Sequence, residues 1–404
     1  MSKFLKVGDV CNITTGSLDS NAFVENGKYP FYTCAKEPTN IDTYAFDDDV
    51  VLVAGNNAQG NFHVNRFKGK FNAYQRTYIL TSNGEISIDY IYYLLSLALK
   101  LLKDKSQGSQ TKFLTIGILR EIQVPNLPNS QIVAKVLSDL DTKIELNNRI
   151  NRELEAMAKT LYDYWFVQFD FPNEQGKPYK SSGGKMVYNA ELKRKIPEGW
   201  EVKTLLDIAT YINGFACQNY RPTNEDYLPV IKIREMRDGI TENTEKVKAD
   251  IPDKLIVNDG DVLFSWSASL EVMIWSGGKG ALNQHIFKVT SKKYPRSFYY
   301  YQLIWYLQHF KMIAELRKTT MGHITQDHLK QSRIVIPPSK IVRALDEKLY
   351  PIQEKQILLH KQNQQLSELR DWLLPMLMNG QVTVKEVGEK LRMAAEPSVE
   401  YKKG

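Results

Sequence analysis

The side chains that could hold a metal or perform acid–base chemistry are not spaced as known sites require. His323 and His328 are five residues apart, whereas the helical zinc motif places two histidines four apart beside a glutamate. The three cysteines, Cys11, Cys34 and Cys217, are scattered and form no Cys-x-x-Cys pair. The pair Pro252-Asp253 lacks the downstream Glu-x-Lys of common metal-dependent nucleases. We therefore expect no metal site.

The loops that bind nucleotides are missing as well. The chain contains neither Gly-x-Gly-x-x-Gly nor Gly-x-x-x-x-Gly-Lys-Ser/Thr, in which backbone N–H groups hold phosphates. It also lacks the Asn/Asp-Pro-Pro-aromatic tetrad with which amino-methyltransferases hold a flipped base. We expect a chain that is not itself an enzyme and binds no cofactor.

Polar side chains gather instead in turns of the first 128 residues. Strands are expected at Tyr29–Thr33, Val50–Ala54, Asn61–Val64 and Tyr74–Leu80, and a helix over Ser87–Lys103. The turns between the strands are Asn56-Asn57, Gln59–Asn61 and Phe67–Lys70, and turns of this composition expose their side chains. This part of the chain is expected to be a mixed α+β domain.

A second globular segment repeats the first. Its expected elements are strands at Leu228–Ile233, Asp261–Trp266 and His285–Val289 and a helix over Ser297–Leu316. Gln75–Tyr78 resembles Gln284–Phe287, and Leu114-Thr115 is echoed by Ile324-Thr325. Matched segments in the same order indicate an internal duplication.

Each globular segment is followed by a long amphipathic helix. The first apolar stripe is Leu137, Leu140, Ile144, Asn147, Asn151, Leu154, Ala158, Leu161 and Trp165. The second, about 212 residues later, is Leu349, Ile352, Gln356, Leu359, Asn363, Leu366, Arg370, Leu373 and Leu377. Steps of three and four place each stripe on one helix face, so the two helices are expected to pair as an antiparallel coiled coil roughly 50 Å long. Pro351 should kink the second helix or delay its start.

Composition and charge fit a soluble cytoplasmic protein. The chain has no run of about 18 apolar residues and opens with no signal peptide. Its net charge is +7; residues 1–130 hold 13 basic and 12 acidic side chains, and residues 172–338 hold 24 and 18. A mild basic excess permits nucleic-acid binding without requiring it.

Four segments resemble one known family in sequence and in order. They are Leu161–Pro172, Ile196–Glu201, Leu282–Ile286 and Leu366–Pro375. With the layout of domain, helix, domain and helix, they make the chain similar to the specificity subunit of type I restriction-modification systems over nearly its whole length.

The resemblance implies an α+β fold with two mixed α/β target-recognition domains joined by two long helices, packed as an antiparallel coiled coil with an internal pseudo-twofold repeat. The implied segments are a first recognition domain (1–128), a first spacer helix (129–171), a linker (172–195), a second recognition domain (196–338), a second spacer helix (339–380) and a tail (381–404). Each domain would read one half of a split double-stranded DNA target. Two N6-adenine methyltransferase subunits would dock on the helices, with restriction subunits added in a full system.

The resemblance also implies which loop residues would contact DNA. Asn and Gln pair well with adenine and Arg with guanine, whereas Lys mostly neutralises phosphate. The expected contacts are Asn56, Asn57, Gln59, Asn61, Arg66, Lys68, Lys70, Arg76, Gln110 and Lys112 in the first domain, and Lys232, Arg234, Arg237, Ser267, Lys318, Thr319 and Thr320 in the second. Any of them could instead be a solvated turn residue. Trp266 could contact DNA or belong to the core, and for Asn283–His285 a structural role is favoured.

Aromatic residues at the helix ends are expected to bind another protein. Tyr162, Trp165, Phe166 and Trp372 offer more aromatic surface than a two-helix seam uses. An ordinary intramolecular coiled coil is the alternative. For the whole chain, the rival functions are a protein-binding scaffold, the specificity subunit of a methylation-only complex, and a nuclease or methyltransferase with unfamiliar motifs.

Overall fold

The computed structural model describes residues 4–56, 62–105, 113–222, 225–267, 269–316 and 323–382. The chain divides into two compact units, Met1–Ile144 with Gln365–Gly404 and Glu145–Gln364. The dividing points lie inside the two long helices. Each unit thus holds one globular part with the adjoining sections of both helices.

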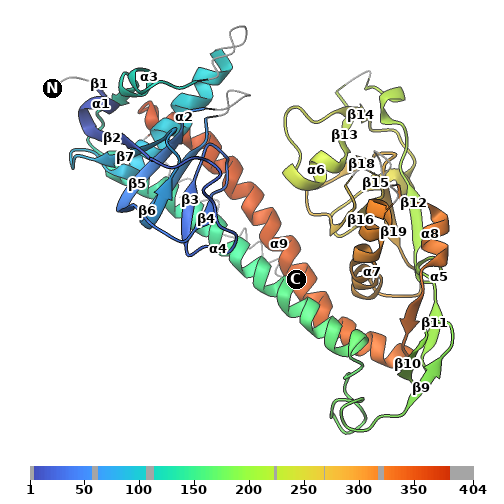
Figure 1. Cartoon of the computed structure of the whole chain (residues 1–404). Helices are drawn as coiled ribbons and strands as arrows, with labels where there is room; N and C mark the ends of the chain where they lie inside the picture. Colours follow the sequence, from blue (N-terminus) through green and yellow to red (C-terminus); the bar gives the residue numbers. More distant parts are fainter. Residues whose placement is uncertain are drawn as a thin grey trace, which may run out of the picture. The chain divides into compact units, whose positions relative to one another are not determined.

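Unit 1 is built on a mixed β-sheet with a helix on one face (Figure 1). The strand order is β2 (Cys11–Thr15), β7 (Thr77–Ser82), β5 (Phe46–Ala54), β6 (Val64–Ala73), β3 (Tyr29–Tyr32) and β4 (Thr39–Ile41). All neighbours are antiparallel except β3 and β6. Helix α2 (Ile88–Lys105) buries Tyr90, Ile91 and Leu95 in the same core as Val51 and Leu80 of the sheet.

Smaller elements complete unit 1. Strand β1 (Phe4–Lys6) pairs with β8 (Gln123–Pro125), and the short helices are α1 (Val7–Val10) and α3 (Ile116–Arg120). The Thr115 side chain accepts a hydrogen bond from the Ile118 N–H and so caps α3. The predicted helix and the predicted strands at Tyr29–Thr33, Val50–Ala54 and Tyr74–Leu80 are confirmed in kind, with ends shifted by a few residues. Of the predicted strand Asn61–Val64, Val64 begins β6. The turn expected at Phe67–Lys70 was wrong, because these residues lie inside β6 and pair with β5.

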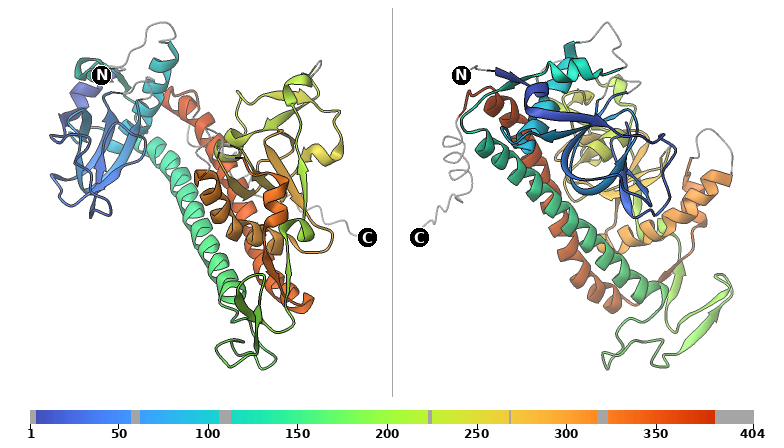
Figure 2. Two further views of the ribbon diagram at one scale, coloured as in Figure 1. Left: turned by 45° about the vertical axis from the view of Figure 1, so that its right-hand side comes forward. Right: turned by 60° about the vertical axis from the view of Figure 1, so that its left-hand side comes forward.

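Unit 2, coloured from green through yellow to orange in Figure 2, repeats the plan with two four-stranded sheets. One sheet is β12 (Thr210–Asn213), β19 (Ile286–Thr290), β16 (Val262–Ser265) and β17 (Glu271–Ile274). The other is β14 (Lys246–Lys248), β13 (Tyr227–Ile231), β18 (Gly280–Leu282) and β15 (Ile256–Val257). The order β12-β19-β16 matches β2-β7-β5 of unit 1, and the parallel pair β13–β18 matches β3–β6. The duplication expected from the sequence is therefore present in the backbone.

The other elements of unit 2 follow the same correspondence. Strand β11 (Glu201–Lys203) pairs with β20 (Ile334–Ile336), as β1 pairs with β8. The helices are α5 (Leu205–Ile208), α6 (Ile233–Asp238), α7 (Arg296–Leu316) and α8 (Gln326–Gln331), with 3₁₀ turns at Cys217–Asn219 and Asp253–Leu255. Within the predicted strand Leu228–Ile233, the strand ends at Ile231 and Ile233 begins α6.

The segment expected to be a linker is built into unit 2. Strands β9 (Met186–Asn189) and β10 (Arg194–Pro197) form a hairpin, and Tyr179 and Met186 pack against the main core. The Asp170 carboxylate accepts hydrogen bonds from the Ser181 N–H (2.7 Å) and the Ser181 hydroxyl (2.6 Å). These bonds fasten the turn that carries the hairpin.

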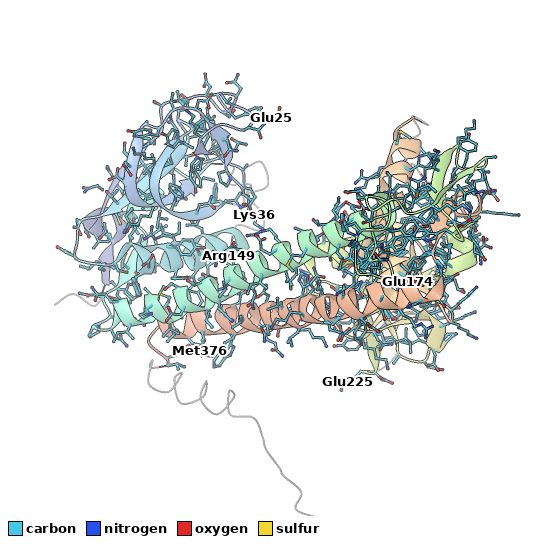
Figure 3. The ribbon with its side chains drawn as sticks, turned by 90° about the horizontal axis from the view of Figure 1, so that it is seen from below. Glu25, Lys36, Arg149, Glu174, Glu225 and Met376 are labelled. Atoms are coloured by element: carbon cyan, nitrogen blue, oxygen red, sulfur yellow. The ribbon has the colours of Figure 1, made fainter. Side chains whose placement is uncertain are left out.

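The long helices α4 (Ser130–Tyr162) and α9 (Ser339–Met378) pack antiparallel. In unit 1, Leu137 near the start of α4 shares a core with Leu373 and Leu377 near the end of α9. In unit 2, Ala158 near the end of α4 shares a core with Leu349 of α9. Figure 3 shows side chains projecting from the rest of both helices, with Arg149 on α4 and Met376 on α9. The predicted antiparallel coiled coil is confirmed.

Pro351 does not delay the second helix. Helix α9 begins at Ser339 and is helical through Pro351 to Met378. A five-residue π-helix, Asp163–Val167, follows α4. The expected delay at Pro351 was therefore wrong. The missing N–H of Pro351 removes one helical hydrogen bond, but the buried side chains of Leu349 and Gln353 on either side hold the helix in place.

Candidate nucleic-acid interface

In unit 1, residues far apart in the sequence meet where β5 ends and β7 begins. The Gly55 N–H donates to the Arg76 carbonyl (2.8 Å), and the Leu114 N–H donates to the Gly55 carbonyl (3.0 Å). Asn56 and Phe113 form an isolated antiparallel bridge. We call Gly55, Asn56, Arg76 and Phe113 the tip of unit 1. Its Arg76 is exposed, as is Phe113 at 54%.

The same backbone arrangement recurs in unit 2. The Trp266 N–H donates to the His285 carbonyl (3.3 Å), and the Ile324 N–H donates to the Trp266 carbonyl (2.9 Å). We call Trp266, Ser267, His285 and His323 the tip of unit 2. The Trp266 ring contacts both imidazoles, and its centroid lies 5.7 Å from that of His285 and 5.6 Å from that of His323. Both histidines are exposed.

The tip of unit 1 contains two of the predicted residues, Asn56 and Arg76. Asn56 is bridged to Phe113, so segments that are far apart in the sequence meet there. Arg76 of the predicted set lies beside them. Ser267 is 3% exposed, which corrects its expected role, because a buried hydroxyl cannot reach a base edge. Asn57, Gln59, Asn61, Gln110, Lys112, Lys318, Thr319 and Thr320 lie outside the described residues.

Arg66 is held inside unit 1 by acidic neighbours. Its guanidinium pairs with Asp49 and with Asp89 (2.7 Å) and donates to the Val50 and Phe67 carbonyls. Burial lowers its pKa, but the hydrogen bonds to Asp49 and Asp89 outweigh burial and raise the pKa above the usual value. With its donors used in the fold, Arg66 is better explained as a structural residue. Lys68 and Lys70 remain exposed, and DNA contact stays a prediction for them.

The predicted cations of unit 2 are also paired. Lys232 pairs with Glu245, and Arg237 with Glu271. Arg234 pairs with Glu235 (2.7 Å), whose side chain is 1% exposed. A buried carboxylate needs such a partner, so Arg234 stabilises α6. DNA contact by these three residues stays a prediction. In the structure each of them already has a carboxylate partner within unit 2.

Tyrosine–lysine pairs were missed by the sequence reasoning. At the edge of unit 2, Lys246 lies 4.0 Å from the Tyr227 ring centroid, and Lys248 lies 5.5 Å from that of Tyr220. At the matching edge of unit 1, Lys70 lies 4.5 Å from the Tyr44 ring centroid. Such pairs depend on strand register, and alternation along one strand gives no signal for them.

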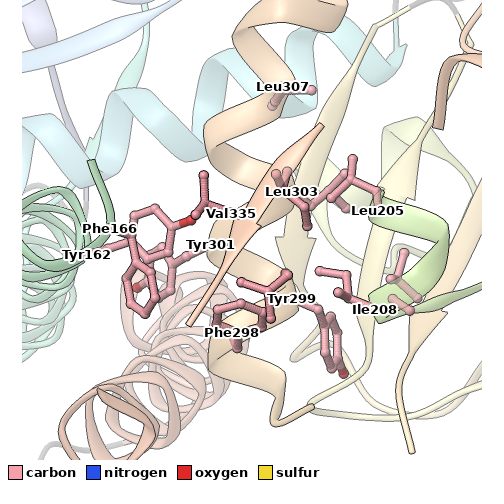
Figure 4. Packing of buried hydrophobic residues seen from close by; sticks show 14 of the residues in the cluster. Tyr162, Phe166, Leu205, Ile208, Phe298, Tyr299, Tyr301, Leu303, Leu307 and Val335 are labelled. Carbon is pink, nitrogen blue, oxygen red and sulfur yellow. The ribbon is translucent and has the colours of Figure 1, made fainter. Parts of the chain in front are cut away.

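The aromatic end of α4 is core rather than surface. Tyr162, Trp165 and Phe166 are 3%, 4% and 5% exposed. Figure 4 shows Tyr162 and Phe166 packed beside Tyr301 and Phe298 of α7. Burial raises the pKa of the Tyr162 hydroxyl well above its usual value. Their expected role in partner binding is thus corrected, because the fold of unit 2 itself consumes this aromatic surface. Trp372, 46% exposed, stays a candidate.

A polar layer interrupts the helix seam inside unit 2. The Asn147 side-chain amide donates to Asn363 Oδ1 (2.9 Å), and the Asn363 amide donates to Asn148 Oδ1 (2.7 Å). Asn151, one turn further along α4, is 7% exposed, and its side-chain amide has no partner among the described residues. The seam is therefore continuous but not uniformly apolar.

Two other kinds of site are absent from the residues that the structure describes. Within these ranges, no helix is long and apolar enough to cross a membrane. In the same part of the chain, no group of three or more His, Cys, Asp or Glu side chains is arranged to hold a metal ion.

Comparison with known proteins gives a consistent result. A family model, the type I restriction modification DNA specificity domain, matches residues 2–156 and again 197–368. The MjaIX specificity subunit of a type I restriction enzyme from Methanocaldococcus jannaschii is 29% identical over 327 residues, covering 76% of this chain and 72% of the relative. The EcoDI specificity subunit from Escherichia coli is 35% identical over 188 residues, which is 46% of this chain and 41% of that protein.

A solved structure shares the fold. It is the S subunit of a type I restriction-modification system from M. genitalium, with a TM-score of 0.59 and 13% identity. The match covers 92% of this chain and 94% of that one. At this identity the likeness concerns the fold alone.

Proposed function

The chain belongs to the type I restriction-modification DNA specificity family, and from that membership we propose that each of its two globular parts reads one half of a split DNA target. The observation that supports this division is the duplicated tip. One backbone arrangement, with equivalent hydrogen bonds, carries Asn56, Arg76 and Phe113 in unit 1 and His285 and His323 in unit 2. A repeated scaffold with different exposed side chains suits the reading of two different sequences.

We assign the chemistry to partner proteins. Methyl transfer to adenine N6 would belong to a separate methyltransferase subunit, two copies of which dock along α4 and α9. ATP-dependent cleavage would belong to a restriction subunit where the system has one. This chain would select the DNA and hold the catalytic subunits there, as its lack of catalytic and cofactor motifs suggests.

The test is to express this chain with an N6-adenine methyltransferase subunit of the same system and map methylated adenines across the host genome. The expected result is methylation at a split motif with a fixed gap. A stable complex that leaves the genome unmethylated would refute the proposal for that pair and favour a protein-binding scaffold. Methylation without any cleavage in the full system would identify a methylation-only complex.

A domain exchange tests the modular part of the proposal. Replacing residues 1–128 by the corresponding domain of another specificity subunit should change only one half of the methylated motif. The reciprocal replacement of residues 196–338 is the matched control and should change only the other half. If either exchange altered both halves, independent reading by the two units would be wrong.

A further inference from the structure

We propose that Arg76 and His285, which occupy equivalent positions at the two tips, are base-contacting residues that make the two half-sites different, with Arg76 reading a guanine. The inference rests on the proposed function. It adds to that function one specificity-determining position in each domain.

The equivalence of the two positions follows from matched turns. The Thr77 N–H donates to the Tyr74 carbonyl (2.8 Å), and the Ile286 N–H donates to the Asn283 carbonyl (3.0 Å). Each turn leads into the strand that pairs with β5 or β16. Arg76 and His285 are the third residues of these turns. The Arg76 carbonyl accepts from the N–H of Gly55, directly after β5, and the His285 carbonyl accepts from the N–H of Trp266, directly after β16.

Both side chains start from a fixed backbone. Gln75, beside Arg76, donates through Nε2 to Asp19 Oδ1 (2.9 Å). The His285 N–H donates to Asn283 Oδ1 (3.2 Å), and its imidazole packs against Trp266. The Trp266 indole N–H in turn donates to Asn213 Oδ1 (3.1 Å). The backbone that carries Arg76 and the imidazole of His285 are therefore ordered before a ligand binds.

The charge of Arg76 is available for a ligand. Within the described part of the chain, its guanidinium has no ion-pair partner, in contrast to Arg66 with its two carboxylates. Arg76 is exposed, beside Asn56 and the exposed Phe113. A free guanidinium can donate two parallel hydrogen bonds to guanine O6 and N7, and an apolar ring beside it suits a thymine methyl group. This chemistry assigns a guanine to the half-site read by unit 1.

Unit 2 presents different chemistry at the same position. The His285 imidazole offers one hydrogen-bonding edge, and its Nε2 lies 3.3 Å from Gln284 Nε2. His323, in the place of Phe113, also packs against Trp266, with ring centroids 5.6 Å apart. Imidazole cannot reproduce the two-pronged contact of a guanidinium, so the matching base of the second half-site is read differently.

The difference between the tips also favours DNA over a protein as their ligand. Two copies of one methyltransferase would present the same surface to both tips, and matching side chains would then be expected at equivalent positions. Instead, Gly55 stands where unit 2 has Trp266, Arg76 where it has His285, and Phe113 where it has His323. Two unlike half-sites account for such divergence on one scaffold.

The test measures base discrimination by the complex of this chain with its methyltransferase. Duplexes carry the methylated motif with one base pair changed at a time, and their affinities are compared for the wild type and for Arg76→Ala, Arg76→Lys and His285→Ala. For the wild type, changing the guanine read by Arg76 should weaken binding roughly 5- to 150-fold. Both Arg76 variants should lose that penalty at this base pair alone, while His285→Ala should lose one in the other half-site.

Lys100→Ala, which removes an exposed cation from α2, is the matched charge control and should keep every penalty. Melting temperature and assembly with the methyltransferase check that the variants fold. Unchanged penalties in Arg76→Ala and His285→Ala would overturn this inference while leaving the proposed function intact. A wild-type complex that discriminates at no base pair would instead refute the proposed function.

Discussion

At the scale of single residues, the structure separates side chains that hold the fold from those that face solvent. Arg66, Arg76 and Arg234 belong to one residue type, yet only Arg76 has no carboxylate partner among the described residues. Tyr162 and Trp372 both lie near the C-terminal ends of the long helices, yet the first is 3% and the second 46% exposed. Residue type therefore gave a set of candidates, and burial and pairing divide it.

At two matching positions, Gly16 and Gly214, another stretch of backbone approaches too closely for a side chain. A Cβ on Gly16 would lie 2.0 Å from the Ala73 carbonyl oxygen, and one on Gly214 would lie 2.1 Å from that of Asn283. Alanine at either position should destabilise its own unit by about 1–3 kcal/mol or more, because backbone must move to admit the methyl group. Thermal unfolding measures the loss. Gly117→Ala is the control, because a Cβ there would meet only Thr115 Oγ1, at an ordinary contact distance of 3.8 Å. An equal loss there would contradict this account.

The two tryptophans of the helix ends should respond in opposite ways. Trp165→Ala should cost about 3–5 kcal/mol of unfolding free energy, because the side chain is 4% exposed within the core of unit 2. Trp372→Ala should change stability by less than about 1 kcal/mol but weaken methyltransferase binding. Denaturant unfolding and a pull-down with the methyltransferase measure the two effects. Unimpaired binding of the Trp372 variant would remove the last predicted docking residue.

At the scale of elements, periodicity predicted the long helices well and the segment between the domains poorly. Both stripes pack as expected, because a heptad pattern is local and repeats many times. Residues 172–195 carry Pro, Gly and Ser that indicate a linker, yet Asp170 and Ser181 fasten the turn and β9 pairs with β10. Contacts from outside the segment decide its structure.

The seam contains a mismatch that the duplication reveals. In α9, Asn363 and Leu359 are the counterparts of Asn151 and Asn147 in α4, about 212 residues apart in each case. Asn147 bonds to Asn363 (2.9 Å), so in an antiparallel pair, one turn onward, Asn151 faces Leu359. Leu359 is 2% exposed and cannot bond to the buried Asn151 amide.

Asn151→Leu should therefore stabilise the helix pair. Removing a buried amide without a partner is expected to raise the free energy of unfolding by about 1–3 kcal/mol. Chemical denaturation of the full chain measures it. The same substitution at Asn147 is the matched control and should lower stability, because Asn363 Oδ1 would lose the side-chain amide that donates to it. Equal effects of the two substitutions would show that the polar layer has no directional pairing.

At the scale of the whole molecule, α4 and α9 pack against each other, so the length of the spacer that we propose they form would be set jointly by two helices. Leu137 pairs with the end of α9 and Ala158 with its beginning, so every layer of the seam needs residues from both helices. A change of length in one helix alone shifts all later layers out of register.

A matched insertion should lengthen the spacer. Adding seven residues between Ile144 and Asn147 and seven between Asn363 and Leu366 extends the helix pair by roughly 10 Å at about 1.5 Å per residue. The gap in the methylated motif should widen, by at most about three base pairs at 3.4 Å each, with both half-sites unchanged. Methylation mapping measures the gap. An unchanged gap would refute the spacer role.

The insertion in α4 alone is the control for that experiment. It leaves the seam mismatched beyond the insertion, so loss of stability or of the complex is expected rather than a defined longer gap. A well-behaved longer gap from the single insertion would show that α9 does not share in setting the distance.

The sequence by itself determined the duplication, the paired helices and the absence of familiar catalytic motifs, because repeats, heptads and short motifs are written in neighbouring residues. Only the tertiary structure decided which polar residues form a surface. Arg76 and Phe113 lie far apart in the chain and meet through the hydrogen bonds of Gly55, whereas Arg66 turns to Asp49 and Asp89, and Trp165 enters the core. Burial and charge pairing arise from long-range contacts, and no local pattern records them.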